Sequence, residues 1–162
     1  MKRIYLIIIL ILLLIIDNTI LPSYFIGGVY PSFLFVFAMA YSIIRGKKEA
    51  VFIGIASGLL QDLFFFSGFG INLFLNTLLC LLCSKIGEGI FKENRIVPIL
   101  TALLVSILKV LGVAIIFKLF SQNINMKIAL LSALLNAVCM LIFYKLILNM
   151  LDKRSEERRV GK

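Results

Sequence analysis

The sequence has no histidine and no tryptophan among its 162 residues, and only eight of its side chains are acidic. Without histidine, the Ser–His and Cys–His pairs that activate a nucleophile are absent, which excludes a rhomboid-type protease. The three cysteines, Cys80, Cys83 and Cys139, all lie within apolar runs. We therefore interpret them as small embedded side chains rather than as disulfides or zinc ligands.

Acidic side chains within the apolar segments are equally scarce. An aspartyl intramembrane protease, such as lipoprotein signal peptidase, needs two carboxylates that share one site. Here only Asp62 is embedded, whereas Asp17 lies at the outer end of the first apolar run and in no matching motif. Glycine-rich phosphate loops and clusters of metal ligands are also missing. We expect no enzyme activity, no catalytic residue, no cofactor and no metal.

Charged residues make up only 15% of the chain, compared with about 25% in soluble domains. Hydrophobic residues account for 62% and the mean hydropathy is +1.10, which is more apolar surface than a water-soluble core of this size can bury. A bilayer accepts such surface on helices that satisfy their own backbone hydrogen bonds. The composition predicts an all-α integral membrane protein. The net charge of +9 does not indicate a nucleic-acid partner, because the basic residues lie in short clusters between apolar runs.

Six apolar segments qualify as membrane spans, since a span needs about 20 residues and fewer where the bilayer thins. We expect the first to remain uncleaved, because no small-residue cleavage site follows it. The third and fourth meet at a tight Ser67–Gly70 turn, so a re-entrant hairpin is an alternative for this pair. Residues 154–162, RSEERRVGK, would form a short cytoplasmic tail, and their likeness to a translated sequencing adapter favours a non-native origin. The expected spans of the single domain 1–153 are 4–21, 29–44, 50–66, 69–84, 96–120 and 128–151.

Basic residues in the loops give the orientation of this six-helix bundle. With six crossings, nine lysines and arginines fall on one side of the membrane and two on the other. The positive side is the cytoplasmic one, so we expect both termini in the cytoplasm of a bacterium and a multi-pass protein of its cytoplasmic membrane. The nine are Lys2, Arg3, Arg45, Lys47, Lys48, Lys85, Lys92, Arg95 and Lys153, and the two are Lys118 and Lys127.

Small and polar side chains mark the faces on which helices associate in lipid, where no hydrophobic drive brings helices together. The third segment carries Gly54, Gly58 and Asp62 on one ridge at four-residue spacing. The fourth and sixth segments have comparable faces, which include Asn76 and Asn136. The first segment is almost entirely isoleucine and leucine, which suits lipid or a partner's helix. We therefore expect segments three to six to form the packed centre.

Asp62 and Lys109 are the two ionisable residues placed well inside the expected spans. A charge in hydrocarbon costs a few kcal/mol or more unless it is paired or hydrated. Both residues lie roughly 18–20 Å from the inner boundary at 1.5 Å per residue. We hypothesise an Asp62–Lys109 pair within a buried polar cluster that includes Gln61, Asn76 and Asn136. The alternative is that Asp62 caps the short loop that follows it, while Lys109 extends along its own helix toward the interface.

Two stretches of the chain carry a family resemblance. Pro31 stands at the start of the second span, directly before Ser32-Phe33-Leu34. The third span contains GIASGLLQD, from Gly54 through Gly58 to Asp62, and is followed by the Ser67–Gly70 turn. These residues resemble the rod shape-determining protein MreD family, although an acidic residue often stands where this chain has Ser32. We assign structural, helix-packing roles to Pro31, Gly54, Gly58, Gly68 and Gly70.

The resemblance implies a non-enzymatic scaffold subunit of the bacterial cell-elongation machinery. Such a subunit would bind the bitopic protein MreC and help couple MreB filaments to peptidoglycan synthesis by RodA and its penicillin-binding partner. The expected loops are short, so we expect helix faces within the lipid bilayer, including the apolar first span, to be the main contact surface.

An alternative function is that of the substrate-binding component of an energy-coupling-factor vitamin transporter. These components are also small six-span proteins, and the MreD family is thought to share their general fold. They commonly carry an A-x-x-x-A face on the first helix, whereas Ile4–Ile16 contains no small residue. This alternative stays open with a ligand pocket lined by Asn72, Asn76, Asn136 and Asp62.

Overall fold

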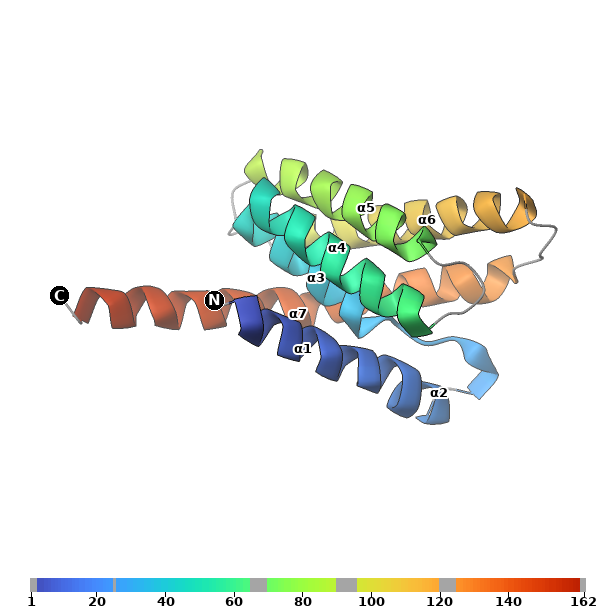
Figure 1. The fold of residues 1–162 in the computed structure, drawn as a ribbon, viewed down its shortest axis with the longest axis horizontal. Coiled ribbons are helices and arrows are strands. Elements are labelled where there is room, and N and C mark those ends of the chain that lie inside the picture. The colour runs from blue at the N-terminus through green and yellow to red at the C-terminus, as the bar shows by residue number, and fades with distance from the viewer. Residues whose placement is uncertain (1–2, 25, 65–69, 90–95, 120–124, 161–162) are drawn as a thin grey trace.

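A computed structural model describes residues 3–24, 26–64, 70–89, 96–119 and 125–160, with the backbone alone at residues 26 and 150–160. All regular elements in these ranges are helical, which confirms the predicted all-α class. Successive long helices run antiparallel, so that α1 begins and α7 ends on the same side of the bundle (Figure 1). The elements are α1 (Arg3–Ile15), η1 (Ile16–Ile20), α2 (Leu21–Tyr24), η2 (Ile26–Gly28), α3 (Phe33–Arg45), α4 (Lys47–Phe64), α5 (Ile71–Glu88), α6 (Ile96–Leu119) and α7 (Met126–Val160).

Four helical stretches are long and apolar enough to cross a bilayer, as expected of a membrane protein. A helix lies at each of the six expected positions, but two of them differ from the other four. Helix α3 is apolar yet has only 13 residues, which span about 20 Å at 1.5 Å per residue. Helix α4 has 18 residues but carries four charged side chains. Six crossings therefore stay a prediction. The four stretches are Arg3–Tyr24, Ile71–Glu88, Ile96–Leu119 and Met126–Asn149.

Helix α3 is the centre of the bundle. Every side chain from Leu34 to Ile44 is buried, and α3 contacts α1, α4, α5, α6 and α7. The prediction that the third to sixth segments form the packed centre was wrong in leaving out the second. The sequence FLFVFAMAYSII is apolar on all sides, and such a helix is best surrounded by other helices. Large side chains such as Phe35, Phe37 and Tyr41 fill the space there, so no small-residue ridge marks this position.

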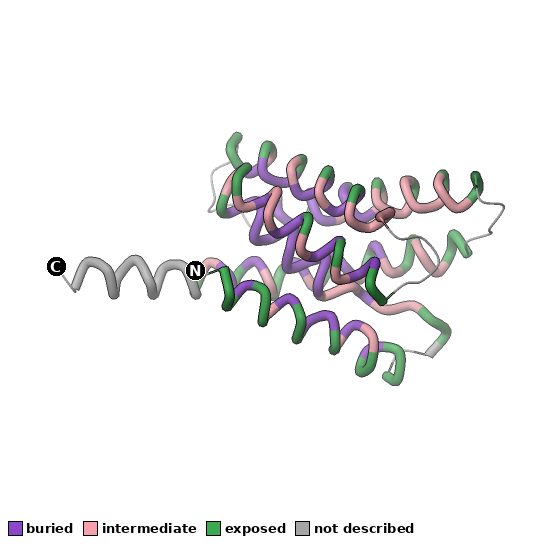
Figure 2. The backbone as a smooth tube through the Cα atoms, viewed as in Figure 1, coloured by how far each residue is buried: buried purple, intermediate pink, exposed green. Residues whose placement is uncertain are grey.

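Helix α1 buries one face and leaves the other open. Leu6, Leu10, Leu13 and Leu14 are buried against the neighbouring helices α3 and α4. Figure 2 shows the opposite face as an exposed strip along the helix. The exposed large side chains of α1 are Ile4, Tyr5, Ile7, Ile8, Ile11, Leu12 and Ile15.

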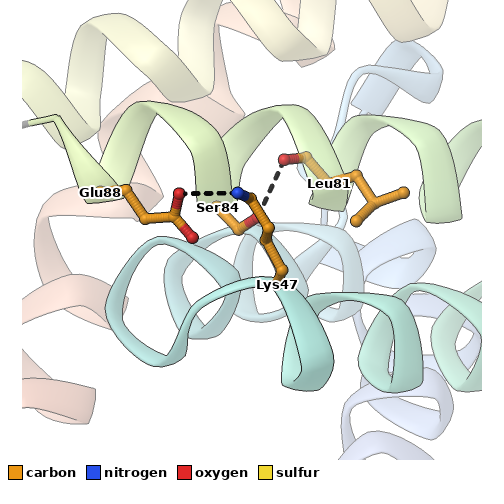
Figure 3. A network of polar contacts seen from close by, with 4 residues as sticks. All are labelled: Lys47, Leu81, Ser84 and Glu88. Atoms are coloured by element: carbon orange, nitrogen blue, oxygen red, sulfur yellow. Dashed lines mark hydrogen bonds and ion pairs between the residues drawn. The ribbon is translucent and has the colours of Figure 1, made fainter.

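At the end of the bundle where α4 begins, an ion pair joins α4 to α5. Lys47 Nζ lies 3.0 Å from Glu88 Oε2, and the Ser84 hydroxyl donates to the Leu81 carbonyl one turn away (Figure 3). Both charged side chains are about half exposed, at 55% and 49%. Exposed pairs of this kind stabilise a fold by less than about 1 kcal/mol, so packing rather than charge holds this end together.

Candidate functional site

A buried carboxylate ties the first span to the start of α3. Asp17 lies in η1, a π-helical turn of five residues between α1 and α2, and is only 8% exposed. Its Oδ1 accepts a 2.8 Å hydrogen bond from the Phe33 amide, and its Oδ2 accepts 3.0 Å bonds from the Leu34 amide and the Ser32 hydroxyl. The free amides and the dipole of a helix N-terminus favour a negative charge at this position. Asp17 therefore acts as a cap supplied by another helix.

A second carboxylate, that of Asp62, caps the N-terminus of α5. Asp62 is 2% exposed and accepts hydrogen bonds from the amides of Gly70, Asn72 and Leu73 at 2.9, 3.0 and 2.8 Å. The structure contains no ion pair between Asp62 and Lys109, so the hypothesised pair was wrong. The physical reason is that three amides at a helix N-terminus already satisfy both oxygens of the carboxylate.

The Gln61 side chain connects the start of α3 to α4, α5 and α6. Its Nε2 donates a 3.1 Å hydrogen bond to the Ser32 hydroxyl oxygen. Its Oε1 accepts 2.9 Å hydrogen bonds from both Asn76 Nδ2 and Lys109 Nζ. Because the Ser32 hydroxyl donates onward to Asp17, one continuous network reaches from the first span to α6. Each member satisfies polar groups that lipid could not.

Lys109 is held without a carboxylate partner. Its ammonium lies 4.1 Å from the centre of the Phe35 ring, within the range of a cation–π contact. Within the described part of the chain, its hydrogen bond to Gln61 is the only one that it makes. Because the ammonium is held by Gln61 and Phe35, Lys109 does not extend along α6 into the interface as the alternative prediction proposed. The other part of that alternative, in which Asp62 caps the short loop after it, agrees with the hydrogen bond from the Gly70 amide.

Asn136 brings α7 into the same network. Its Oδ1 accepts a 2.8 Å hydrogen bond from the Ser32 amide, and its Nδ2 donates to the Ser106 hydroxyl at 3.4 Å. Of the five residues expected in the polar cluster, Asn76 and Lys109 each donate a hydrogen bond to Gln61. Asn136 joins them through Ser32, and Asp62 points away to α5.

Neither of the two cavities beside Lys109 brings together the residues of the expected ligand pocket, Asn72, Asn76, Asn136 and Asp62. Asn76 is fully buried and Asp62 nearly so, and neither lines these two cavities. Asn136 and Asn72 line two different cavities, of about 200 and 180 Å³. Lys109 lines both of them.

Glycines allow α4 and α5 to touch backbone to backbone. A Cβ atom added at Gly54 would lie 2.7 Å from the Thr77 Cα, and one at Gly58 would lie 2.5 Å from the Asn72 carbonyl oxygen. Backbone atoms cannot move aside as a side chain can, so any larger residue would force the two helices apart. Helix α4 runs close beside α5 in Figure 1, as this contact requires.

The other positions expected to be structural differ in what they do. Gly70 directly precedes α5 and has a φ of 99°, a conformation that favours glycine. Gly68 lies outside the described residues. Pro31 is buried directly before the N-cap of α3. Sequence reasoning missed Gly87, whose added Cβ would collide with the Ile43 carbonyl group where α5 crosses α3.

Asp17 and Ser32 were also missed as site residues. Their signal was present: an aspartate near the end of one apolar run, and a serine directly before the next. Serine directly before a helix is a preferred N-cap, and the Ser32 hydroxyl oxygen accepts a 3.4 Å hydrogen bond from the Phe35 amide. Nothing in the linear sequence indicates that the Asp17 carboxylate also reaches this cap.

The described residues contain no group of three or more His, Cys, Asp or Glu side chains that could hold a metal ion. Cys80 and Cys83 are buried as free thiols on α5. The polar side chains of this network join helix ends and satisfy most of one another's hydrogen bonds, and the exception among the described residues is the buried Asn76 Oδ1.

Comparison with known proteins gives one family. The model of the family described as rod shape-determining protein MreD matches residues 1–154. No significant match is found among curated proteins or solved structures. The predicted family resemblance is confirmed, whereas the likeness to energy-coupling-factor components stays a prediction.

Proposed function

Because the chain belongs to the rod shape-determining protein MreD family, we propose that it is a non-enzymatic scaffold subunit of the bacterial cell-elongation machinery. In this role it binds MreC and helps couple MreB filaments to peptidoglycan synthesis by RodA and a penicillin-binding protein. The family match over residues 1–154 carries the proposal, since it implies a role in rod shape determination.

The proposed location is the bacterial cytoplasmic membrane, with six crossings and both termini inside. Support comes from the charges of the described residues, because basic side chains concentrate on the cytoplasmic side. Helix α3 is short for a span, but neighbouring helices surround it and a buried helix tolerates such a mismatch. Apart from Lys109 and Lys145 within α6 and α7, the basic residues with described side chains are Arg3, Arg45, Lys47, Lys48 and Lys85 at the end where α1 begins, and Lys118 and Lys127 at the opposite end.

We assign the MreC contact to the exposed face of α1. Beyond Arg3 and Tyr5 at its start, this face presents only isoleucine and leucine and no small side chain, so a partner helix would pack on it mainly through dispersion contacts. The opposite face of α1, formed by leucines, already packs on α3 and α4. The exposed face is thus the part of the first span that is free to bind a partner.

Co-purification with MreC tests both the function and the surface. Leu12 on α1 and Leu104 on α6 are each 55% exposed, which makes Leu12→Asn and Leu104→Asn a matched pair. We expect L12N to lower the recovery of MreC several-fold and L104N to leave it unchanged, at equal expression and equal thermal stability. Failure of the unaltered protein to retain MreC would refute the function. Equal MreC recovery by both variants would refute the surface alone.

A further inference from the structure

Two adjoining cavities flank Lys109 at the end of the bundle opposite the Lys47–Glu88 pair. They measure about 200 and 180 Å³ and share Tyr30, Ser32 and Lys109 in their walls. The first lies between α6 and α7, where Ser132 adds a hydroxyl, and no carboxylate lines it. The second lies toward the first span, where Asn18 adds an amide and Asp17 a carboxylate. Polar side chains from several helices therefore face space that no other part of the described chain fills.

The ammonium of Lys109 forms no direct ion pair with a described carboxylate, although Asp17 and Asp62 lie near enough to attract its charge. Lys109 donates one hydrogen bond, to Gln61 Oε1, and that oxygen also accepts from Asn76. An ammonium group has three donors, so two remain for other acceptors. The carboxylates of Asp17 and Asp62 each already accept three hydrogen bonds at a helix N-terminus. A lysine held among membrane helices without a directly paired counter-ion is costly.

We propose that the first of these cavities, whose wall contains no carboxylate, binds an oxyanion, a carboxylate or a phosphate group, through Lys109. Either group pairs with an ammonium by short charge-assisted hydrogen bonds, and asparagine and serine side chains donate to its remaining oxygens. Each cavity is smaller than the roughly 300–1,000 Å³ of pockets for drug-sized ligands. The site therefore takes a small anion, or only the anionic head of a larger molecule. The inference is independent of MreC binding.

Thermal unfolding of the purified protein tests the site. Sodium acetate and sodium phosphate are titrated separately against sodium chloride at equal ionic strength. We expect a saturable rise in Tm with at least one of the two oxyanions. Lys109→Met should weaken the apparent affinity by about tenfold or more, as expected for loss of a charged hydrogen bond. Lys118→Met is the matched control, because Lys118 is exposed on the same helix and lines neither cavity.

A cavity-filling variant keeps the test decisive if K109M does not fold. Ala129→Leu adds bulk to the wall of the first cavity and leaves Lys109 in place, so it should also abolish the oxyanion effect. Acetate alone raising the Tm would identify a carboxylate ligand. If phosphate raises the Tm, the measurement is repeated in nanodiscs of phosphatidylglycerol without added phosphate. A Lys109-dependent rise in these nanodiscs indicates a lipid headgroup as the ligand, and its absence indicates free phosphate. The proposal is overturned if neither anion raises the Tm, or if all variants respond equally.

Discussion

The Ser32 hydroxyl donates a 3.0 Å hydrogen bond to the carboxylate of Asp17, fifteen positions earlier in the chain. Asp17 thus closes the hairpin of α1 and α3, as Asp62 closes the hairpin of α4 and α5. Ser32 also accepts from Gln61, the neighbour of Asp62 on α4. The two helical hairpins are each closed by an aspartate that caps the second helix, and they are linked to each other at one end of the bundle.

Removal of the Asp17 carboxylate should destabilise the protein strongly. Asp17→Ala leaves two amides and one hydroxyl without their charged acceptor, which we expect to lower the free energy of unfolding by on the order of 3 kcal/mol. Asp17→Asn should cost less, since its amide oxygen still accepts. Unfolding in detergent micelles measures both. The control is Thr19→Ala, because Thr19 is exposed and its hydroxyl donates only to the Ile15 carbonyl of its own helix. Equal losses for D17A and T19A would contradict the capping role.

A double-mutant cycle should separate the partners of Lys109. We expect Gln61→Leu and Lys109→Met to be coupled by about 1 kcal/mol or more, because their side chains share a hydrogen bond. Asp62→Asn and Lys109→Met should be coupled more weakly, since the two residues have no hydrogen-bond partner in common. The free energy of unfolding of each single and double variant is the measurement. A coupling energy larger for Asp62 with Lys109 than for Gln61 with Lys109 would support the ion pair instead.

Glycine substitutions should differ according to what the new methyl group meets. At Gly58 it meets the backbone of α5, so Gly58→Ala should cost about 1–3 kcal/mol of stability by forcing the helices apart. At Gly112 it meets only the end of the Leu75 side chain, 2.8 Å away, which can rotate. Gly112→Ala should be nearly neutral, since alanine also favours the helix by up to about 1 kcal/mol. Thermal unfolding of the two variants side by side tests this order, and its reversal would contradict the close α4–α5 contact.

The Lys47–Glu88 pair should matter little for stability. Its side chains are about half exposed, so solvent screens their attraction. We expect Glu88→Gln to change the free energy of unfolding by less than about 1 kcal/mol, with a smaller difference at high salt. Asp17→Asn, measured under the same conditions, provides the buried comparison. A loss for E88Q as large as that for D17N would show that this end depends on the ion pair.

Part of the candidate site could be predicted from residue types alone. Polar side chains inside apolar helices need partners, and this reasoning indicated Gln61, Asn76 and Lys109, which the structure joins by hydrogen bonds. The pairing of Asp62 with Lys109 failed because depth along a helix does not give the direction in which a side chain points, whereas the alternative of a loop cap agrees with the Gly70 hydrogen bond. The nearest donors of Asp62 are amides of α5, and free amides at a helix start are invisible in a list of polar side chains.

The sequence by itself determined the helical class, the positions of the helices and the membrane environment. These follow from the lengths of apolar runs and from the need of backbone groups for hydrogen bonds in lipid, both of which are local properties. Only the tertiary structure decided that α3 is central, that Gly87 meets Ile43, and that Asp17 caps α3 while Lys109 bonds to Gln61 instead of a carboxylate. Those results depend on which faces of different helices meet, and no local pattern encodes the rotation of one helix relative to another.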